Sequence, residues 1–184
     1  MQLALAQNMS SIELQWNQTI PQQEKGRKFE EKYAQLQYMF VGGDIEKLSE
    51  VKADRAKGSA RLKWIAYKDQ FFSTVLIADD AFESTQMEST PLNALSRYIK
   101  EYNTTTSLPL DITGKKTTDL HYYLGPNHYN TLKAYDKDVE KADRLHLNEL
   151  VPLGWKIVSW INKALVIPMF NLFTSWGLHI GIVI

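Results

Sequence analysis

Residues 62–78 read LKWIAYKDQFFSTVLIA, and this stretch decides the fold class. It is rich in aromatic and β-branched side chains, which pack well on a pleated sheet and are enriched in strands. The stretch is longer than an ordinary strand. It therefore predicts either one long strand or two consecutive strands.

Strand-like alternation of apolar and polar residues recurs on both sides of this stretch. The runs are residues 12–16, 36–40, 98–110 and 120–124. The threonine-rich run 98–110 predicts a strand pair, and Gly42-Gly43-Asp44 is a turn signal. Residues 44–58 are charged and weakly periodic, and they are predicted to form a solvated loop. Short strands separated by turn residues predict an antiparallel sheet or sandwich.

The period of the apolar residues changes after Pro126. Asn127 is predicted to cap a helix in which Tyr129 and Leu132 fall near helical spacing. Residues 138–150 predict a second short helix. The sequence therefore places a helical end, residues 127–150, behind the strands.

Charge is distributed unevenly along the chain. Of 21 Lys and Arg residues and 21 Asp and Glu residues, only Lys156 and Lys163 lie beyond residue 149. Residues 164–184 carry no formal charge. As a helix, that run would span roughly 30 Å, which is about the thickness of a hydrocarbon core.

Residues 151–175 have an amphipathic pattern. Apolar residues at offsets 0, 4, 7, 8 and 11 share one helical face: Leu153, Ile157, Trp160, Ile161 and Ala164. Lys156, Ser159 and Lys163 share the other face, and Pro168 is expected to interrupt the helix. Such a pattern is typical of a helix on a membrane surface, although a soluble amphipathic helix is the alternative. The predicted membrane-interface residues are Trp155, Lys156, Trp160, Lys163 and Trp176.

Several classes of function find no support in the sequence. The balanced charge does not indicate a nucleic-acid surface. The chain has no cysteine, so disulfides, thiolate zinc sites and cysteine nucleophiles are excluded. The four histidines lack metal-ligand spacing. Glu30-Glu31 and Asp79-Asp80 are interpreted as surface charge, so no catalytic residue, metal or cofactor is predicted.

Residues 122–129 read YYLGPNHY, and residues 150–155 read LVPLGW. The first segment resembles the junction that closes the periplasmic domain of YidC-type membrane protein insertases, particularly the Bacteroidetes type. The second, with residues 160–162, is similar to the interfacial helix of that family. Further segments resemble the family in the same order: residues 23–30 and 62–72 its strands, and residues 167–170 and 175–178 the start of its second transmembrane helix. Gly125, Pro126 and Gly154 mark the domain junction in this resemblance.

The resemblance implies a mainly β fold, a part of a β-super-sandwich related to galactose mutarotase, with helices behind it. Residues 1–126 would be the sandwich portion of the periplasmic domain and residues 127–150 its helical end. Residues 151–175 would be an interfacial amphipathic segment, and residues 176–184 the start of a truncated transmembrane helix.

The resemblance also implies a function, which is to assist the insertion and folding of inner-membrane proteins, alone or with the Sec translocon. The implied partners are the lipid bilayer, nascent membrane proteins and Sec components, with residues 1–150 on the periplasmic side of the inner membrane. The family has no bond-making chemistry and uses a hydrophilic groove with a positive residue on its second transmembrane helix. No Lys or Arg follows Lys163, so that residue is not in this sequence.

Two other functions stay open at this stage. One is a carbohydrate-binding or mutarotase-like sandwich, which needs a paired acid and base in a cleft. The other is a membrane-anchored binding domain.

Overall fold

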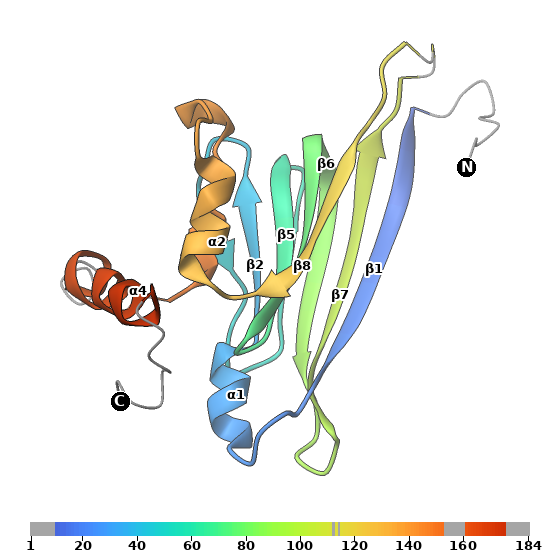
Figure 1. The fold of residues 1–184 in the computed structure, drawn as a ribbon. Coiled ribbons are helices and arrows are strands. Elements are labelled where there is room, and N and C mark those ends of the chain that lie inside the picture. The colour runs from blue at the N-terminus through green and yellow to red at the C-terminus, as the bar shows by residue number, and fades with distance from the viewer. Residues whose placement is uncertain (1–9, 112, 114, 153–160, 176–184) are drawn as a thin grey trace. The chain divides into compact units, whose positions relative to one another are not determined.

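The computed structural model describes residues 10–111, 113, 115–152 and 161–175 (Figure 1). Contacts between Cα atoms divide the chain into two units. The first, Met1–Leu150, is called the β unit below, and the second, Val151–Ile184, is called the tail.

The described part of the β unit forms eight strands, and all of them pair antiparallel. They are β1 Ser11–Pro21, β2 Gln35–Phe40, β3 Ile45–Lys47, β4 Asp54–Gly58, β5 Leu62–Lys68, β6 Phe72–Pro91, β7 Tyr98–Pro109 and β8 Leu120–Pro126. The prediction of a mainly β fold is confirmed. Residues 62–78 form two consecutive strands, and the second continues to Pro91. The run 98–110 forms the single strand β7, so the predicted strand pair is wrong.

Strands β3 and β4 contradict the prediction of a solvated loop over residues 44–58. β3 pairs with β2, and β4 pairs with the last part of β6. Both lie at sheet edges and carry charged side chains such as Lys47, Arg55 and Lys57. Charged edge strands are common because they discourage pairing with other chains. They bury too little apolar surface to produce a clear alternation of apolar and polar residues. They could therefore not be predicted from the sequence pattern.

Strand β6 belongs to both layers of a sandwich. Its first part pairs with β5 and β8, and its last part pairs with β4 and β7. The pairing register shifts between Glu83 and Gln86, and Ser84 has a φ of 48°. Such an irregularity bends a strand and lets it pass from one sheet to another. The strand therefore turns a corner near Ser84 and runs back.

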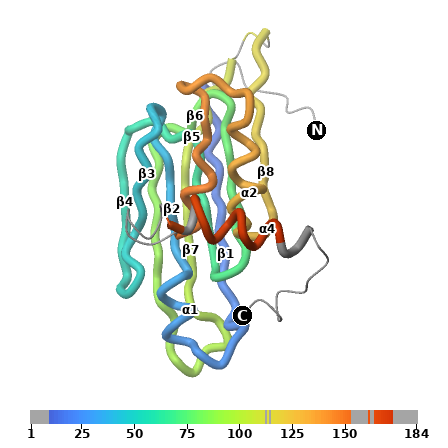
Figure 2. Tube along the Cα trace, turned by 60° about the vertical axis from the view of Figure 1, so that its left-hand side comes forward, coloured from blue at the N-terminus to red at the C-terminus, as the bar shows by residue number. Residues whose placement is uncertain are grey.

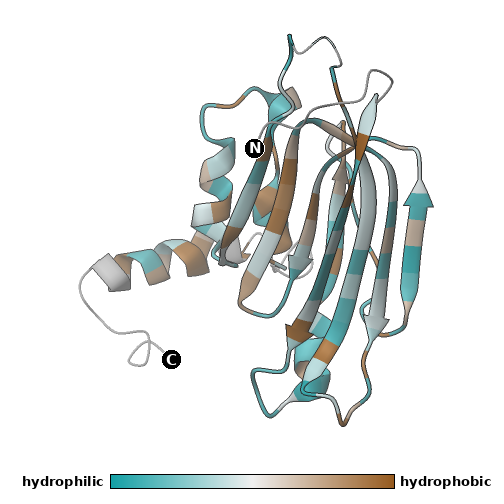
Figure 3. Cartoon of the chain, turned by 90° about the vertical axis from the view of Figure 1, so that its right-hand side faces the viewer, coloured by the Kyte–Doolittle hydropathy of each residue, from teal (hydrophilic) through white to brown (hydrophobic). Residues whose placement is uncertain are grey.

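The core lies between the layer β1-β7-β6-β4 and the layer β3-β2-β5-β6-β8. Trp16 of β1 stacks on Tyr67 of β5, with ring centroids 3.8 Å apart. The Tyr67 hydroxyl lies 2.6 Å from Thr104 Oγ1 of β7, so a polar contact also joins the layers. Alternating apolar and polar bands along the strands are visible in Figure 3. Members of the buried cluster include Ile20, Leu36, Tyr38, Leu62, Ile65, Leu76, Phe82, Met87, Ile99, Tyr102 and Leu108.

Helix α1 (Arg27–Tyr33) follows β1. The resemblance placed a strand segment over residues 23–30, and the structure instead shows a loop and the start of α1. Glu30 is 4% exposed, and its Oε1 accepts hydrogen bonds from the backbone N–H groups of Gln23 (2.9 Å) and Glu24 (2.8 Å). The interpretation of Glu30 as surface charge is therefore wrong, because this carboxylate fixes the loop that leads into the helix.

The predicted helical end contains one short α-helix, α2 (Tyr129–Lys133). The second predicted helix, over residues 138–150, is wrong: this stretch holds only the 3₁₀ turns Lys141–Asp143 and Leu147–Leu150. The reason is local. The Asp136 carboxylate accepts the backbone N–H groups of Leu145 (2.6 Å) and His146 (3.0 Å), and His146 adopts a φ of 50° that no α-helix contains.

In the tail, the described residues form a π-helical segment, Asn162–Val166, followed directly by α4, Ile167–Ser175. The expected interruption at Pro168 is therefore wrong. Pro168 is the second residue of α4, just behind the wider π turn. A π turn relieves the clash between the proline ring and the carbonyl of the preceding turn, so the chain stays helical through the proline.

Candidate functional site

The described part of the tail carries an apolar stripe. Ile161, Leu165, Met169 and Leu172 are 40–62% exposed. Their offsets of 0, 4, 8 and 11 place them along one face of a helix. Isolated exposed apolar residues are ordinary on a protein surface, but a continuous helical row indicates a surface that contacts an apolar phase or a partner.

Most of the interface residues predicted from the sequence lie outside the described residues. These are Trp155, Lys156, Trp160 and Trp176, and the predicted junction residue Gly154 also lies outside the described residues. Lys163 belongs to the π segment, where only its backbone is described. Met169 and Leu172 were not predicted because Pro168 was expected to interrupt the helix before them. Leu165 was not among the residues assigned to the apolar face. No helix among residues 161–175, or elsewhere in the described chain, is long and apolar enough to cross a bilayer.

Gly125 and Pro126, the other predicted junction residues, end strand β8. A Cβ atom on Gly125 would lie 2.7 Å from the Tyr123 hydroxyl oxygen. That hydroxyl donates a hydrogen bond to the Pro126 carbonyl (2.7 Å). Glycine is therefore required here because the Tyr123 side chain closes over the backbone of the junction.

Asn127 lies at the junction. It was predicted to cap α2, and this prediction is wrong. The residue at the cap position is His128, and its side chain makes no capping bond. The Asn127 side-chain amide instead donates to the Asp69 carbonyl (3.0 Å), and its backbone N–H donates to the Phe71 carbonyl (2.7 Å). The junction is thus fastened to the turn between β5 and β6.

Lys68 ties the last residue of the β unit to strand β5. It is 1% exposed, and its Nζ donates a hydrogen bond to the Leu150 carbonyl (2.8 Å). Burial lowers the pKa of Lys68 to about 8, and the nearby Lys47 charge adds to this. No sequence pattern indicates this contact, because a lysine at the end of a strand is ordinarily solvated.

Residues 4–168 match the family model of the YidC periplasmic domain. The chain belongs to this family. The predicted resemblance to YidC-type insertases is therefore confirmed over nearly the whole sequence.

Individual YidC relatives support the same assignment. The chain is 46% identical over 180 residues to "Membrane protein insertase YidC" of Parabacteroides distasonis, covering 98% of this chain and 28% of the relative. It is 49% identical over 174 residues to the protein of the same name from Azobacteroides pseudotrichonymphae, covering 95% of this chain and 28% of the relative. A Porphyromonas gingivalis relative is 35% identical over 178 residues. The chain thus spans less than a third of the length of these YidC proteins.

The alternative of a sugar-binding or mutarotase-like domain needs a pocket with a paired acid and base, and one open pocket of about 460 Å³ contains a histidine and an aspartate side by side. Lys63, Asp79, His121, Tyr123 and Tyr135 are among its lining residues. His121 Nε2 lies 3.0 Å from Asp79 Oδ1, but both side chains are more than half exposed. Water screens such a pair, whereas general acid–base catalysis is favoured by desolvated groups with shifted pKa values. Within the described residues, no group of three His, Cys, Asp or Glu side chains is placed to hold a metal ion.

Proposed function

We propose that this chain is the extracytoplasmic part of an inner-membrane insertase, and that its tail holds the β unit at the bilayer surface. The single observation that carries this proposal is the stripe formed by Ile161, Leu165, Met169 and Leu172. The names of the YidC relatives, which are membrane protein insertases, support the insertase part of the proposal.

In this proposal, residues 1–126 and 127–150 are the sandwich and the helical end of a domain on the periplasmic side. Residues 151–175 lie in the membrane interface, with Trp155, Lys156, Trp160, Lys163 and Trp176 at the border between acyl chains and water. Residues 176–184 begin a transmembrane helix. Nascent membrane proteins are the clients, and Sec translocon components are a further partner.

The β unit positions clients or partners but does not carry out insertion itself. A charged side chain at the bilayer centre costs about 2.5–3.5 kcal/mol even on the mild translocon scale. A water-filled groove between several transmembrane helices offsets that cost. We infer that this groove belongs to the part of the YidC relatives that the chain does not span. Expression of this chain in cells depleted of their own insertase is therefore expected not to restore insertion of a small client.

The membrane contact is tested by flotation of the full 184-residue chain with vesicles that contain phosphatidylglycerol. Three substitutions, Leu165→Gln, Met169→Gln and Leu172→Gln, place polar groups on the stripe. Each removes about 1 kcal/mol or more of apolar burial, so binding is expected to fall about 100-fold. A control, Ser159→Gln with Asn171→Gln, changes polar tail positions away from the predicted apolar face and is expected to float like the original chain. Equal flotation of the stripe variant and the control would disprove the proposed contact.

A further inference from the structure

Three loops of the β unit are held around helix α1 by polar contacts. Arg27 donates hydrogen bonds to four main-chain carbonyls of the β6–β7 connection: those of Leu92, Asn93, Ser96 and Tyr98. Lys100 Nζ lies 2.5–2.8 Å from the carbonyl oxygens of Glu31, Ala34 and Glu50. Gln23 Nε2 donates to Asp69 Oδ2 (3.1 Å) in the β5–β6 turn. Residues 22–34, 49–53, 69–72 and 92–97 therefore form one end of the β unit, called the α1 end below.

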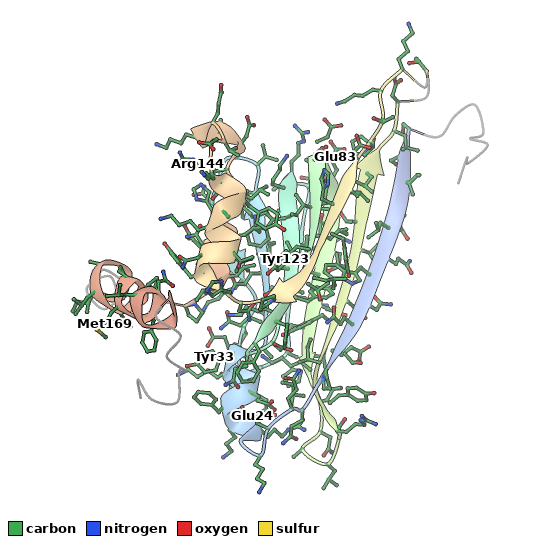
Figure 4. All side chains as sticks on the ribbon, in the orientation of Figure 1. Glu24, Tyr33, Glu83, Tyr123, Arg144 and Met169 are labelled. Atoms are coloured by element: carbon green, nitrogen blue, oxygen red, sulfur yellow. The ribbon has the colours of Figure 1, made fainter. Side chains whose placement is uncertain are left out.

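Figures 1 and 2 both show α1 beside the tip of the β6–β7 connection. Glu24 and Tyr33 mark this end in Figure 4, whereas Glu83 and Arg144 mark the opposite end. Helix α1 and the three loops thus lie at one end of the β unit, although they are far apart in the sequence.

Large apolar side chains are exposed in every part of the α1 end. They are Phe29 (52%), Val51 (83%), Phe71 (42%), Phe72 (53%) and Leu95 (96%). Leu95 is the most exposed large apolar residue among the described residues, and it lies at a hairpin tip. These side chains are not part of the buried core. Their position at one end of the β unit indicates a contact surface.

Cations outnumber available anions at the same end. Lys25, Lys28, Lys32 and Lys52 are exposed and, within the described residues, lie beyond ion-pair distance of any carboxylate. The carboxylates of this end are mostly engaged: Glu31 pairs with Arg27, Glu50 pairs with Lys47, and Glu30 and Asp69 accept backbone N–H groups. Glu24 is the exposed exception.

The chain leaves the β unit at this end. Lys68 holds the Leu150 carbonyl and is the neighbour of Asp69 in the β5–β6 turn. The last residue of the β unit, Leu150, is therefore held beside the turn that carries the exposed Phe71 and Phe72. Aromatic side chains mixed with lysines are the composition expected of a surface that meets lipid headgroups.

We propose that the α1 end is a second bilayer contact, which inserts Leu95 and Phe29 among anionic phospholipid headgroups. The proposal rests on the function proposed above, because the tail would bring this end to the membrane. Charge complementarity selects anionic lipid as the occupant, since lysines near such a surface are attracted to it. The α1 end would then fix the orientation of the β unit, whereas the tail only tethers it.

Because the chain contains no cysteine, single-cysteine labelling tests the orientation directly. An environment-sensitive dye is attached to Leu95→Cys in the full chain, and to Ser59→Cys in the β4–β5 turn as the matched control. Vesicles containing phosphatidylglycerol are expected to shift the emission of the Leu95→Cys dye to the blue and to leave the Ser59→Cys dye unchanged. An equal response at both sites, or an equal response to vesicles of phosphatidylcholine alone, would overturn the proposal.

Charge reversal of the exposed lysines is a second test of the α1-end contact. The variant Lys25→Glu, Lys28→Glu, Lys32→Glu is expected to abolish the shift at Leu95→Cys and to weaken vesicle binding about tenfold or more. Reversal of Arg61, Lys115 and Lys116, which changes net charge by the same amount, is expected to do neither. Flotation of the same samples separates the two proposals. Chains that float without a dye shift refute the α1-end contact alone, and chains that do not float refute the proposed function as well.

Discussion

The two ends of the β unit use their cations in opposite ways. At the α1 end, Arg27, Lys68 and Lys100 are largely withdrawn from water and donate to main-chain carbonyl oxygens. At the corner end, where β6 turns near Ser84, the cations are exposed and face carboxylates. The pairs there are Lys116–Asp80 and Arg61–Glu83.

The buried contacts stabilise the fold, whereas the exposed ion pairs contribute little to its stability. An exposed ion pair gains little, because water and salt screen it and two long side chains must be ordered. A buried ammonium group that satisfies several carbonyls is different, since its removal leaves those carbonyls without partners in a dry site. The loops of the α1 end are thus held from inside, which leaves their outer side chains available for contact.

The largest expected effect is that of removing the buried ammonium of Lys100. Lys100→Met keeps most of the apolar stem of the side chain but leaves the carbonyls of Glu31, Ala34 and Glu50 without the ammonium donor. The loss is expected to be about 3 kcal/mol of unfolding free energy. Urea unfolding of the full chain in mild detergent, followed by tryptophan fluorescence, measures it. Lys116→Met at the corner end is the control, and a similar loss in both variants would break the comparison.

The pH dependence of stability comes next. Burial lowers the pKa values of Lys68 and Lys100 to about 8, although the charges of Glu31 and Glu50 oppose this at Lys100. Between pH 8 and 10 the folded chain has released these protons while the unfolded chain still binds them, so stability rises with pH. Each lysine contributes about 1.4 kcal/mol per pH unit at most.

Above pH 10 the trend should reverse. Burial and the hydrogen bond to Glu46 raise the pKa of Tyr38 to about 12, so this tyrosine ionises first in the unfolded chain, which is thereby favoured. Urea midpoints measured from pH 7 to 11 should therefore pass through a maximum. The rise should be absent in a Lys68→Met, Lys100→Met variant, and a rise of unchanged size there would assign it to other groups.

A smaller loss of stability is expected from a substitution at the junction. Gly125→Ala places a methyl group 2.7 Å from the Tyr123 hydroxyl oxygen and 2.8 Å from its Cζ, so the ring must move. Overpacking of this kind costs about 1–3 kcal/mol. Gly58→Ala near the corner end is the matched control, because the nearest atom to its Cβ lies 3.8 Å away. The thermal unfolding midpoints of the two variants are compared. Equal midpoints would show that the Tyr123 ring moves aside without loss of stability.

The smallest effect is predicted for the corner end. Lys116 lies 2.6 Å from Asp80, and this contact lowers the pKa of the exposed Asp80 carboxyl. A double-mutant cycle with Lys116→Met and Asp80→Asn is expected to give no resolvable coupling in urea unfolding, and none in high salt. A clear coupling that persists in high salt would mean that the corner end is also held by its charges.

Part of the candidate site was accessible from local patterns. The charge asymmetry around residue 149 and the helical spacing of apolar residues predict an amphipathic tail without any tertiary information. Met169 and Leu172 of the stripe were not predicted because proline is normally a helix breaker, and the π turn that accommodates Pro168 has no signature of its own in the sequence.

The sequence by itself determined that this protein is mainly β in its first two thirds, because residues on one face of a strand recur with a period of two wherever that face is buried. The tertiary structure alone decided that β6 turns back near Ser84, that the charged β3 and β4 are strands, and that Lys68 and Lys100 bind carbonyls from distant segments. The carbonyl groups that Lys68 and Lys100 bind lie 50 to 82 residues away in the chain. A periodic pattern records only whether a side chain is buried, and not which distant group it meets.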